Sequence, residues 1–213
     1  MHDESASQAA LPLALPDPPL HVVVGDANRM ATRILLEDAS LPASVVILHG
    51  EEGSGKTLLA QLWAQRVQAN ILDMMPCKGG YYLLDGLELH DRDGEEAMFH
   101  AFNRIKGAEA YLLITMRDHP SYVPYILPDL ASRMRAAYPI GLTQPDDTML
   151  RTLFLKRLYD KQLRVDEDVV DYCLARIPRS FAALHRVIEQ LDATAWQSQR
   201  KITKPLVRTL LND

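Results

Sequence analysis

The chain lacks the features that mark membrane-spanning, secreted and disulfide-bonded proteins. It contains no apolar run of about 18 residues, so the sequence predicts no membrane span. Its two cysteines, Cys77 and Cys173, lie far apart and without the spacing of metal ligands. The start Met1-His2-Asp3-Glu4 lacks the basic segment of a secretory signal. Together these absences predict a cytoplasmic protein in a reducing compartment.

Positive charge is also scarce. The chain has 23 Lys and Arg residues against 28 Asp and Glu residues, which gives a net charge of −5. Contacts with nucleic-acid phosphates need clustered cations, so this balance argues against direct sequence-specific DNA binding. Four cations gather near the C-terminus, at Arg200, Lys201, Lys204 and Arg208. We interpret them as a solvated helix face.

The sequence does contain a complete phosphate-binding loop, G-x-x-x-x-G-K-T, at residues 50–57. A β-branched segment at residues 45–48 precedes it and a helical pattern at residues 58–64 follows it, which is the context that gives this motif its meaning. The glycines let backbone N–H groups turn toward phosphate, and the helix N-terminus favours negative charge. The residues expected to hold ADP or ATP here are Gly50, Gly53, Ser54, Gly55, Lys56, Thr57 and Leu58. The Thr57 hydroxyl is also expected to bind Mg²⁺.

Short apolar segments alternate with helical patterns over the first two thirds of the chain. The expected strands are residues 45–48, 70–74, 81–85, 111–115 and 138–142. The expected helices are residues 28–39, 58–69, 95–106 and 127–136. This alternation predicts an α/β core with a parallel sheet and helices on both faces.

Only helical stripes follow residue 143. The first stripe includes Leu150 and Phe154, the second Val169 and Cys173, and the third Phe181. A fourth short helix is expected after Thr203. The prolines of the first residues exclude a stable helix or central strand there. The sequence therefore predicts three parts, namely a disordered tail at 1–20, a nucleotide-binding core at 21–143 and an all-α lid at 144–213.

An acid ends the third expected strand. Asp85 can hold Mg²⁺, usually through water, although a strand-end acid can also be satisfied by a helix N-terminus. The next residue, Gly86, cannot orient an attacking water, and Glu88 is expected to point elsewhere. We therefore predict a pocket that binds nucleotide with weak or absent hydrolysis.

Three further features carry little weight when each is taken alone. Arg133 stands on an expected helix, from which it can reach a phosphate on a neighbouring molecule, although most surface arginines do nothing so specific. Arg179, near the start of the third lid helix, can fold back onto the phosphates or pair locally. The tail segment 8–13 can dock into an apolar pocket as an extended peptide, but its spacing alone favours a plain Ala/Pro-rich linker.

In this order, with a helical lid, these features resemble the AAA+ ATPases. Residues 23–29 are similar to the V-G-x-x-N segment that opens the AAA+ domain of the bacterial replication initiator DnaA and lies by the adenine, which implies an adenine contact for Val24. Residues 112–115, 127–133, 190–192 and 199–205 are most similar to the Hda family of DnaA-related proteins. The resemblance covers about residues 8–213.

The resemblance implies roles for the weaker features. The tail residues Gln8, Leu11, Pro12 and Leu13 are similar to the Hda peptide that binds the DNA polymerase sliding clamp. Arg133 matches the arginine finger, which acts on ATP held by the initiator, and Arg179 matches the sensor II arginine.

The chain also departs from the family pattern. Gly86 stands where a second acid is expected, and Met116-Arg117 stand where the family has the sensor I acid, with Asp118 coming late. The segment before Asp85 is short as well. These departures count against hydrolysis in the chain's own pocket and against filaments of the initiator type.

The leading hypothesis is an adaptor that binds the sliding clamp and DnaA, stimulates hydrolysis of initiator-bound ATP through Arg133 and so limits replication initiation. Three alternatives remain open. The chain could be an active AAA+ ATPase such as a helicase loader, a regulator that binds the initiator without triggering hydrolysis, or a clamp-tethered scaffold for another partner. AAA+ surfaces tend toward head-to-tail contacts, which also allows a homo-oligomer.

Overall fold

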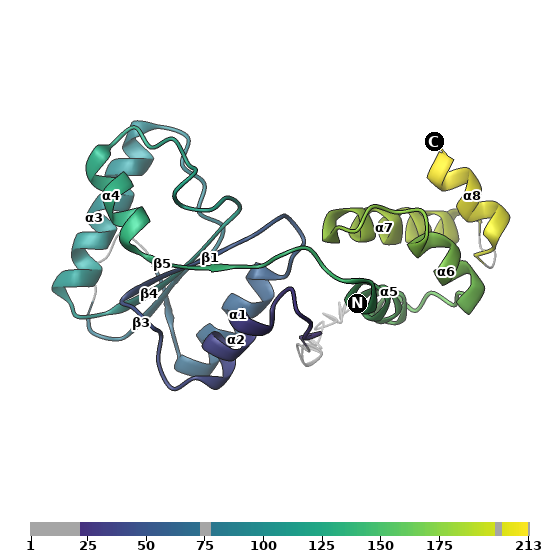
Figure 1. Ribbon diagram of the computed structural model, residues 1–213, viewed down its shortest axis with the longest axis horizontal. Helices are drawn as coiled ribbons and strands as arrows, with labels where there is room; N and C mark the ends of the chain where they lie inside the picture. Colours follow the sequence, from purple (N-terminus) through teal and green to yellow (C-terminus); the bar gives the residue numbers. More distant parts are fainter. Residues whose placement is uncertain (1–21, 73–77, 199–201, 213) are drawn as a thin grey trace, which may run out of the picture.

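The computed structural model describes residues 22–72, 78–198 and 202–212. It consists of an α/β core followed by a helical lid (Figure 1). The expected tail with its clamp peptide lies outside the described residues, as does the end of the expected second strand. Within the described part, no helix is long and apolar enough to cross a membrane.

Five parallel strands form the core sheet in the order β2-β3-β4-β1-β5. Their bounds are Val45–His49 for β1, Asn70–Ile71 for β2, Tyr81–Leu84 for β3, Tyr111–Met116 for β4 and Tyr138–Gly141 for β5. Four strands end within one residue of the sequence prediction, while residues 73 and 74 of the predicted second strand lie outside the described residues. Because β1 pairs with both β4 and β5, it lies inside the sheet and fixes where its carboxyl end, and the loop after it, must stand.

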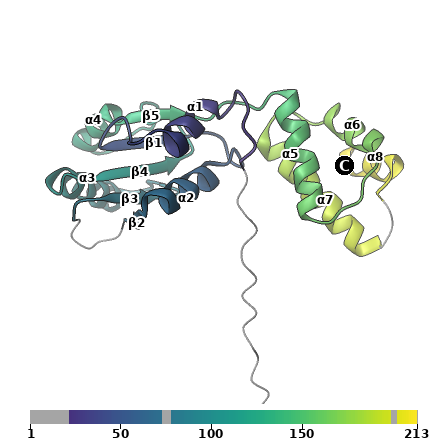
Figure 2. The same ribbon diagram turned by 90° about the horizontal axis from the view of Figure 1, so that it is seen from below.

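Helices cover both faces of the sheet, as the alternating pattern predicted. The core helices are α1 Arg29–Thr32, the π-helix η1 Arg33–Glu37, α2 Lys56–Val67, α3 Arg92–Gly107 and α4 Pro128–Ala136. Figure 1 shows α3 and α4 above the sheet and α1 and α2 below it, and Figure 2 gives the second view of the strand order. Side chains of β1 alternate between the layers, with Val46 and Leu48 on the α2 side and Ile47 on the α3 side.

The first predicted helix ends at Glu37 rather than near residue 39, and its second half is a π-helix. Arg66 of α2 reaches the end of this wider turn. Its guanidinium donates hydrogen bonds to the carbonyl oxygens of Leu35 at 3.0 Å and Asp38 at 2.6 Å. A charged donor thus satisfies carbonyls that the end of the helix leaves without an intrahelical partner.

Helix α3 begins at Arg92, three residues before the predicted start. The cause is an N-cap, because the Asp91 side chain accepts a hydrogen bond from the Gly94 N–H at 2.8 Å. Glu95 is then 3% exposed, and its carboxylate accepts from the N–H groups of Ile126 at 2.9 Å and Leu127 at 2.7 Å. This buried acid ties α3 to the beginning of α4.

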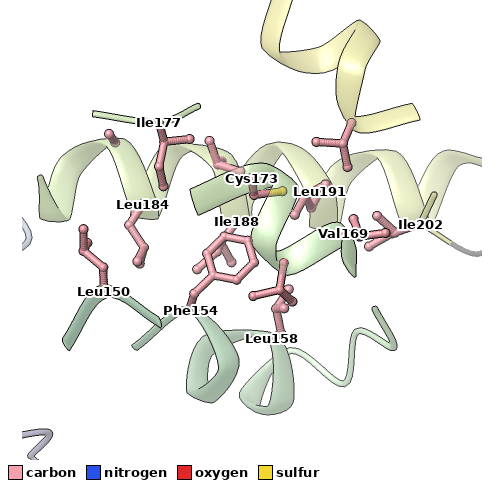
Figure 3. Packing of buried hydrophobic residues seen from close by; sticks show 14 residues of the cluster. Leu150, Phe154, Leu158, Val169, Cys173, Ile177, Leu184, Ile188, Leu191 and Ile202 are labelled. Carbon is pink, nitrogen blue, oxygen red and sulfur yellow. The ribbon is translucent and has the colours of Figure 1, made fainter. Parts of the chain in front are cut away.

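The lid contains the four predicted helices around one apolar core. They are α5 Asp147–Asp160, α6 Glu167–Leu174, α7 Phe181–Ser198 and α8 Lys204–Asn212. Figure 3 shows Phe154 of α5 pointing into the space between Cys173 of α6 and Ile188 of α7. All three side chains are fully buried. Burial raises the pKa of the Cys173 thiol to about 11, so this cysteine is a neutral core residue, as the helical stripe predicted.

A small apolar cluster joins the lid to the core. Ala27, before α1, packs with Met149 of α5 and Phe181 of α7, and all three are buried. Because Phe181 opens α7, this cluster brings the start of that helix next to the loop that follows β1. A Cβ placed on Gly53 of that loop would lie 3.5 Å from Phe181.

Replacing Phe154 by alanine is expected to destabilise the lid by about 3–5 kcal/mol, because the change opens a cavity in a fully buried core. The measurement is the free energy of unfolding in urea, followed by circular dichroism. Tyr159→Ala on the same helix is the matched control, since that ring is 82% exposed and its loss should leave the stability almost unchanged. Equal losses for the two variants would contradict the described lid core.

Candidate functional site

The predicted phosphate loop lies at the carboxyl edge of the sheet, between β1 and α2. Gly50 leaves no room for a side chain, since a Cβ there would lie 3.0 Å from Leu142 and 3.1 Å from the Ser54 hydroxyl. Gly53 and Gly55 have φ values of +77° and +91°, which side chains rarely adopt. The glycines are therefore required by crowding at the first position and by backbone conformation at the other two.

The loop presents unpaired donors to the space above it. The first i→i−4 bond of α2 runs from the Leu59 N–H to the Gly55 carbonyl, so the N–H groups of Lys56, Thr57 and Leu58 precede the helical ladder. The Ser54 hydroxyl is buried and has no hydrogen-bond partner among the described residues. Such donors fit the oxygens of a polyphosphate, which is the group this loop type binds.

Lys56 curls over the loop. Its ammonium donates hydrogen bonds to the carbonyl oxygens of Gly50 and Glu51, both at 2.8 Å. Burial lowers the pKa of Lys56, the opposing charge of Asp85 raises it, and Arg117 lowers it further. A phosphate beside Lys56 would offset the cost of holding this cation away from water.

The predicted metal ligands Thr57 and Asp85 do come together. The Thr57 hydroxyl donates to Oδ1 of Asp85 at 3.3 Å, and the buried Thr115 hydroxyl donates to the same oxygen at 2.5 Å. Across the described residues, no three His, Cys, Asp or Glu side chains form a metal-binding group. One carboxylate and one hydroxyl still suit Mg²⁺, which keeps several waters and takes its other ligands from substrate phosphates.

Gly86 explains why no acid follows Asp85. Its φ is +73°, and its N–H donates to the Thr115 hydroxyl at 2.6 Å, which fixes this turn. An acidic side chain would be strained in that conformation. Glu88, the nearest downstream acid, is exposed and contacts His90 at 3.2 Å, so it is turned toward that ring as expected.

The segment expected beside the adenine is held by Asn28. This side chain is 5% exposed, accepts a hydrogen bond from the Gly25 N–H and donates one to the Val23 carbonyl, both at 2.9 Å. Val24, the residue between them, is 53% exposed. The structure thus leaves an apolar side chain uncovered at the position predicted to contact the base.

Arg179 lies two residues before α7 and forms an ion pair within the lid. Its guanidinium contacts the Asp147 carboxylate at 2.8 and 2.9 Å, and both side chains are 70% exposed. This pair can exchange for a phosphate, because exposed ion pairs contribute little net stability. The same segment lies next to the phosphate loop, because a Cβ on Gly53 would be 3.5 Å from Phe181.

Arg133 lies apart from these residues. It belongs to α4, which covers the opposite face of the sheet from α2 and lies at the end of the core away from the lid (Figure 1). Its guanidinium stacks over the Phe99 ring of α3 at 4.6 Å, and the side chain is partly exposed. Arg133 is therefore not part of the pocket built around Lys56.

Several residues of the site were not predicted from the sequence. Thr115 holds Asp85 and the Gly86 turn, and the only signal for it was a hydroxyl at the end of an apolar strand. The Gly50 N–H donates to the Arg117 carbonyl at 3.1 Å. Beside this bond, the rings of His49 and His119 touch with centroids 4.8 Å apart. No local pattern relates these two histidines.

Known proteins share this architecture. Domain III of the replication initiation protein DnaA from Thermotoga maritima superposes with a TM-score of 0.75 at 18% identity, covering 90% of this chain and 94% of that domain. AMPPCP-bound DnaA from Aquifex aeolicus gives a TM-score of 0.61 at 17% identity, covering 84% of this chain and 67% of that one. A Haemophilus influenzae protein is 26% identical over 227 residues, which cover 96% of this chain and 98% of that protein.

The parallel sheet, the phosphate loop after the interior strand β1 and the helical lid define an AAA+ P-loop core with an all-α lid subdomain, the fold class predicted from the sequence. Residues 146–211 match the family model for the lid domain of Hda. The lid is therefore similar to that of Hda, and the chain as a whole has the fold of DnaA domain III.

Gly86→Ala is expected to destabilise the protein by about 1–2 kcal/mol, because it forces a side chain into a left-handed conformation. Gly107→Ala is the matched control. A Cβ would meet no atom within 4 Å at either position, but Gly107 ends a helix and has no positive φ. Alanine there should be neutral or slightly stabilising. Urea unfolding of both variants tests the assignment, and equal effects would refute the proposed cause.

Proposed function

We propose that the chain is a nucleotide-binding regulator that acts on DnaA while it is held at the sliding clamp. The Lys56 pocket holds ADP or ATP with Mg²⁺, and Arg133 is offered to ATP bound by the initiator. Hydrolysis there would leave ADP-bound initiator and so limit replication initiation. The observation that carries this proposal is the separation of the two sites, since Arg133 lies on α4, away from the chain's own phosphate loop.

The chain's own pocket supports binding better than hydrolysis. When bound, the nucleotide and Mg²⁺ would supply a fixed cluster of charge at the carboxyl edge of the sheet. Thr57 and Asp85 lie where they can hold the metal, and Lys56 can reach the phosphates. No carboxylate directly follows Asp85, because Gly86 occupies the left-handed turn there. The next acid, Glu88, pairs with His90. The AMPPCP-bound DnaA of Aquifex aeolicus supports nucleotide as the ligand.

The nucleotide would also set the position of the lid. Phe181 lies beside Gly53 of the phosphate loop and packs with Ala27 and Met149, so the core of 21–143 and the lid of 144–213 meet at this site. We propose that Arg179 acts as the sensor II arginine by leaving Asp147 for a phosphate. We propose that Val24 contacts the base of this nucleotide and that Leu58 contacts its phosphates.

Arg133 is suited to act in trans. It is partly exposed on α4, and the Phe99 ring supports its guanidinium from α3. Glu95, one turn before Phe99 on α3, holds the start of α4 through two backbone N–H groups. The arginine therefore stands on a braced surface, which reduces the cost of presenting it to a phosphate of another molecule. Head-to-tail contact of this kind also permits a homo-oligomer.

Arg133→Ala is expected to reduce the stimulated hydrolysis of initiator-bound ATP by about 10³-fold or more, the effect of removing an arginine finger. The assay combines clamp-loaded DNA, ATP-bound DnaA and the full chain, and it follows ADP release from the initiator.

Arg135→Ala is the matched control, because it removes an exposed cation from the same helix. Stimulation that survives Arg133→Ala would favour a regulator that binds without triggering hydrolysis. Turnover by the isolated chain that disappears in Lys56→Ala would instead favour an active ATPase.

Binding to the sliding clamp is expected to require the tail. Removing residues 1–20, or replacing Leu11 and Leu13 by alanine, should weaken clamp binding by at least about tenfold, because each apolar anchor buried in a pocket contributes 1.5 kcal/mol or more. Surface plasmon resonance on immobilised clamp measures this, with Leu15→Ala as the control. Undiminished binding by the truncated chain would remove the tail assignment. The proposal that the clamp brings the protein to the nucleoid would then fail as well.

A further inference from the structure

Two histidine rings meet beside the phosphate loop. His49 ends β1 directly before Gly50, and His119 follows β4. Their ring centroids lie 4.8 Å apart in an edge-to-face contact. The sheet register causes this meeting, because His49 pairs with Met116 across β1 and β4, three residues before His119. The pair therefore stands at the edge of the sheet where the phosphate loop begins.

Both rings are held from several sides. The Ser121 N–H donates to Nδ1 of His119 at 3.1 Å, and the Tyr122 ring lies against His119 at 5.1 Å. When His119 is neutral, its proton is therefore on Nε2. A Cβ on Gly141 of β5 would lie 3.1 Å from Cε1 of His49, so a side chain at this position would crowd that ring. The geometry restrains the pair instead of leaving it free in solvent.

The charges around His49 are unevenly distributed. It faces His119 from the segment after β4 and Lys56 from α2, and Gly141 of β5 lies against its ring. Burial first, then His119 and Lys56, lower the pKa of His49. Asp85 and Glu52 raise the pKa of Lys56, and Arg117 lowers it. Asp118 is exposed beside Arg117 in the sequence. The two side chains that act on the pKa of His49 are thus His119 and Lys56, and neither is an acid.

We propose that His49 is a proton-dependent part of the phosphate site, oriented by His119, and that it takes up a proton when a nucleotide polyphosphate binds beside Lys56. This proposal rests on the proposed nucleotide binding. The polyphosphate offsets the repulsion from Lys56 and His119 and so stabilises the imidazolium. Nucleotide affinity then rises as the pH falls from the pKa of His49 in the bound state to its lower pKa in the empty state. The rise is at most about tenfold per pH unit for one linked proton.

The direct test follows the His49 ring by proton–carbon NMR on the isotopically labelled full chain between about pH 5 and about pH 8, a range that includes histidine titration. MgADP is the probe. We expect the titration midpoint of His49 to rise by roughly one unit or more when MgADP is present. The spectrum of His49→Gln assigns the resonance. His185, on the exposed side of α7, is the internal control and should not shift. An unchanged midpoint for His49 with MgADP bound would overturn the proposal.

Calorimetry provides a second measurement and separates the two hypotheses. Binding of MgADP in buffers of different ionisation enthalpy gives the number of protons taken up, and His49→Gln should lose the uptake that His185→Gln retains. If His49→Gln fails to fold, His119→Gln replaces it and should raise the His49 midpoint in the empty protein. MgADP binding that survives Lys56→Ala would defeat the nucleotide proposal itself. Loss of binding in Lys56→Ala, with equal proton uptake by the wild type and His49→Gln, would defeat only the histidine proposal.

Discussion

The placement of β1 between β4 and β5 is the constraint on which the rest of the molecule depends. Hydrogen bonds on both sides hold this strand, and its side chains fill both helical layers. The carboxyl end of β1 is therefore held in place by β4 and β5. The Gly50 N–H extends the arrangement by one more bond to Arg117. A loop that must approach a polyphosphate closely is thereby fixed at its first residue.

The same edge of the sheet collects polar groups from three other elements. Thr115 at the end of β4 bonds to Asp85 after β3, and Asp85 accepts from Thr57 at the start of α2. The left-handed turn at Gly86 completes this network through its N–H. Aligned parallel strands bring such residues together without any sequence proximity. The network that suits a magnesium ligand also includes the left-handed turn in which a second acid would be strained.

Local patterns in the sequence were sufficient for much of the fold. Strands 111–115 and 138–142 follow from short apolar segments. The lid stripe around Phe154 follows from helical periodicity, because one face of that helix must be buried. The longer α3 depended on a cap by Asp91, and the π-helix depended on Arg66 from another helix. These are contacts between side chains and backbone, which periodicity does not encode.

Tertiary contacts explain the parts of the site that the sequence could not supply. The pairing of Arg179 with Asp147 joins residues 32 positions apart, and the meeting of His49 with His119 depends on the register of β1 against β4. Sequence reasoning could assign Lys56 and Thr57 because the phosphate loop is contiguous. It could not show that Gly86 adopts a positive φ, and it could only note that an acid was missing.

The division between a binding pocket and an arginine on another face has a physical rationale. A P-loop that lacks the second acid can keep its nucleotide, and a retained nucleotide can act as a structural part between the core and the lid. Phe181 and Met149 pack at that junction, so a nucleotide bound at the loop would lie next to the start of the lid. To act as proposed on ATP held by another molecule, Arg133 would instead need to be accessible from solvent. The Phe99 ring supports its guanidinium, and the Glu95 carboxylate holds the start of α4. Both residues belong to α3, on the face of the sheet opposite α2. In the proposed function, the loop at the carboxyl edge and Arg133 on the α4 face would each bind a different phosphate, and the core between them would keep the two apart.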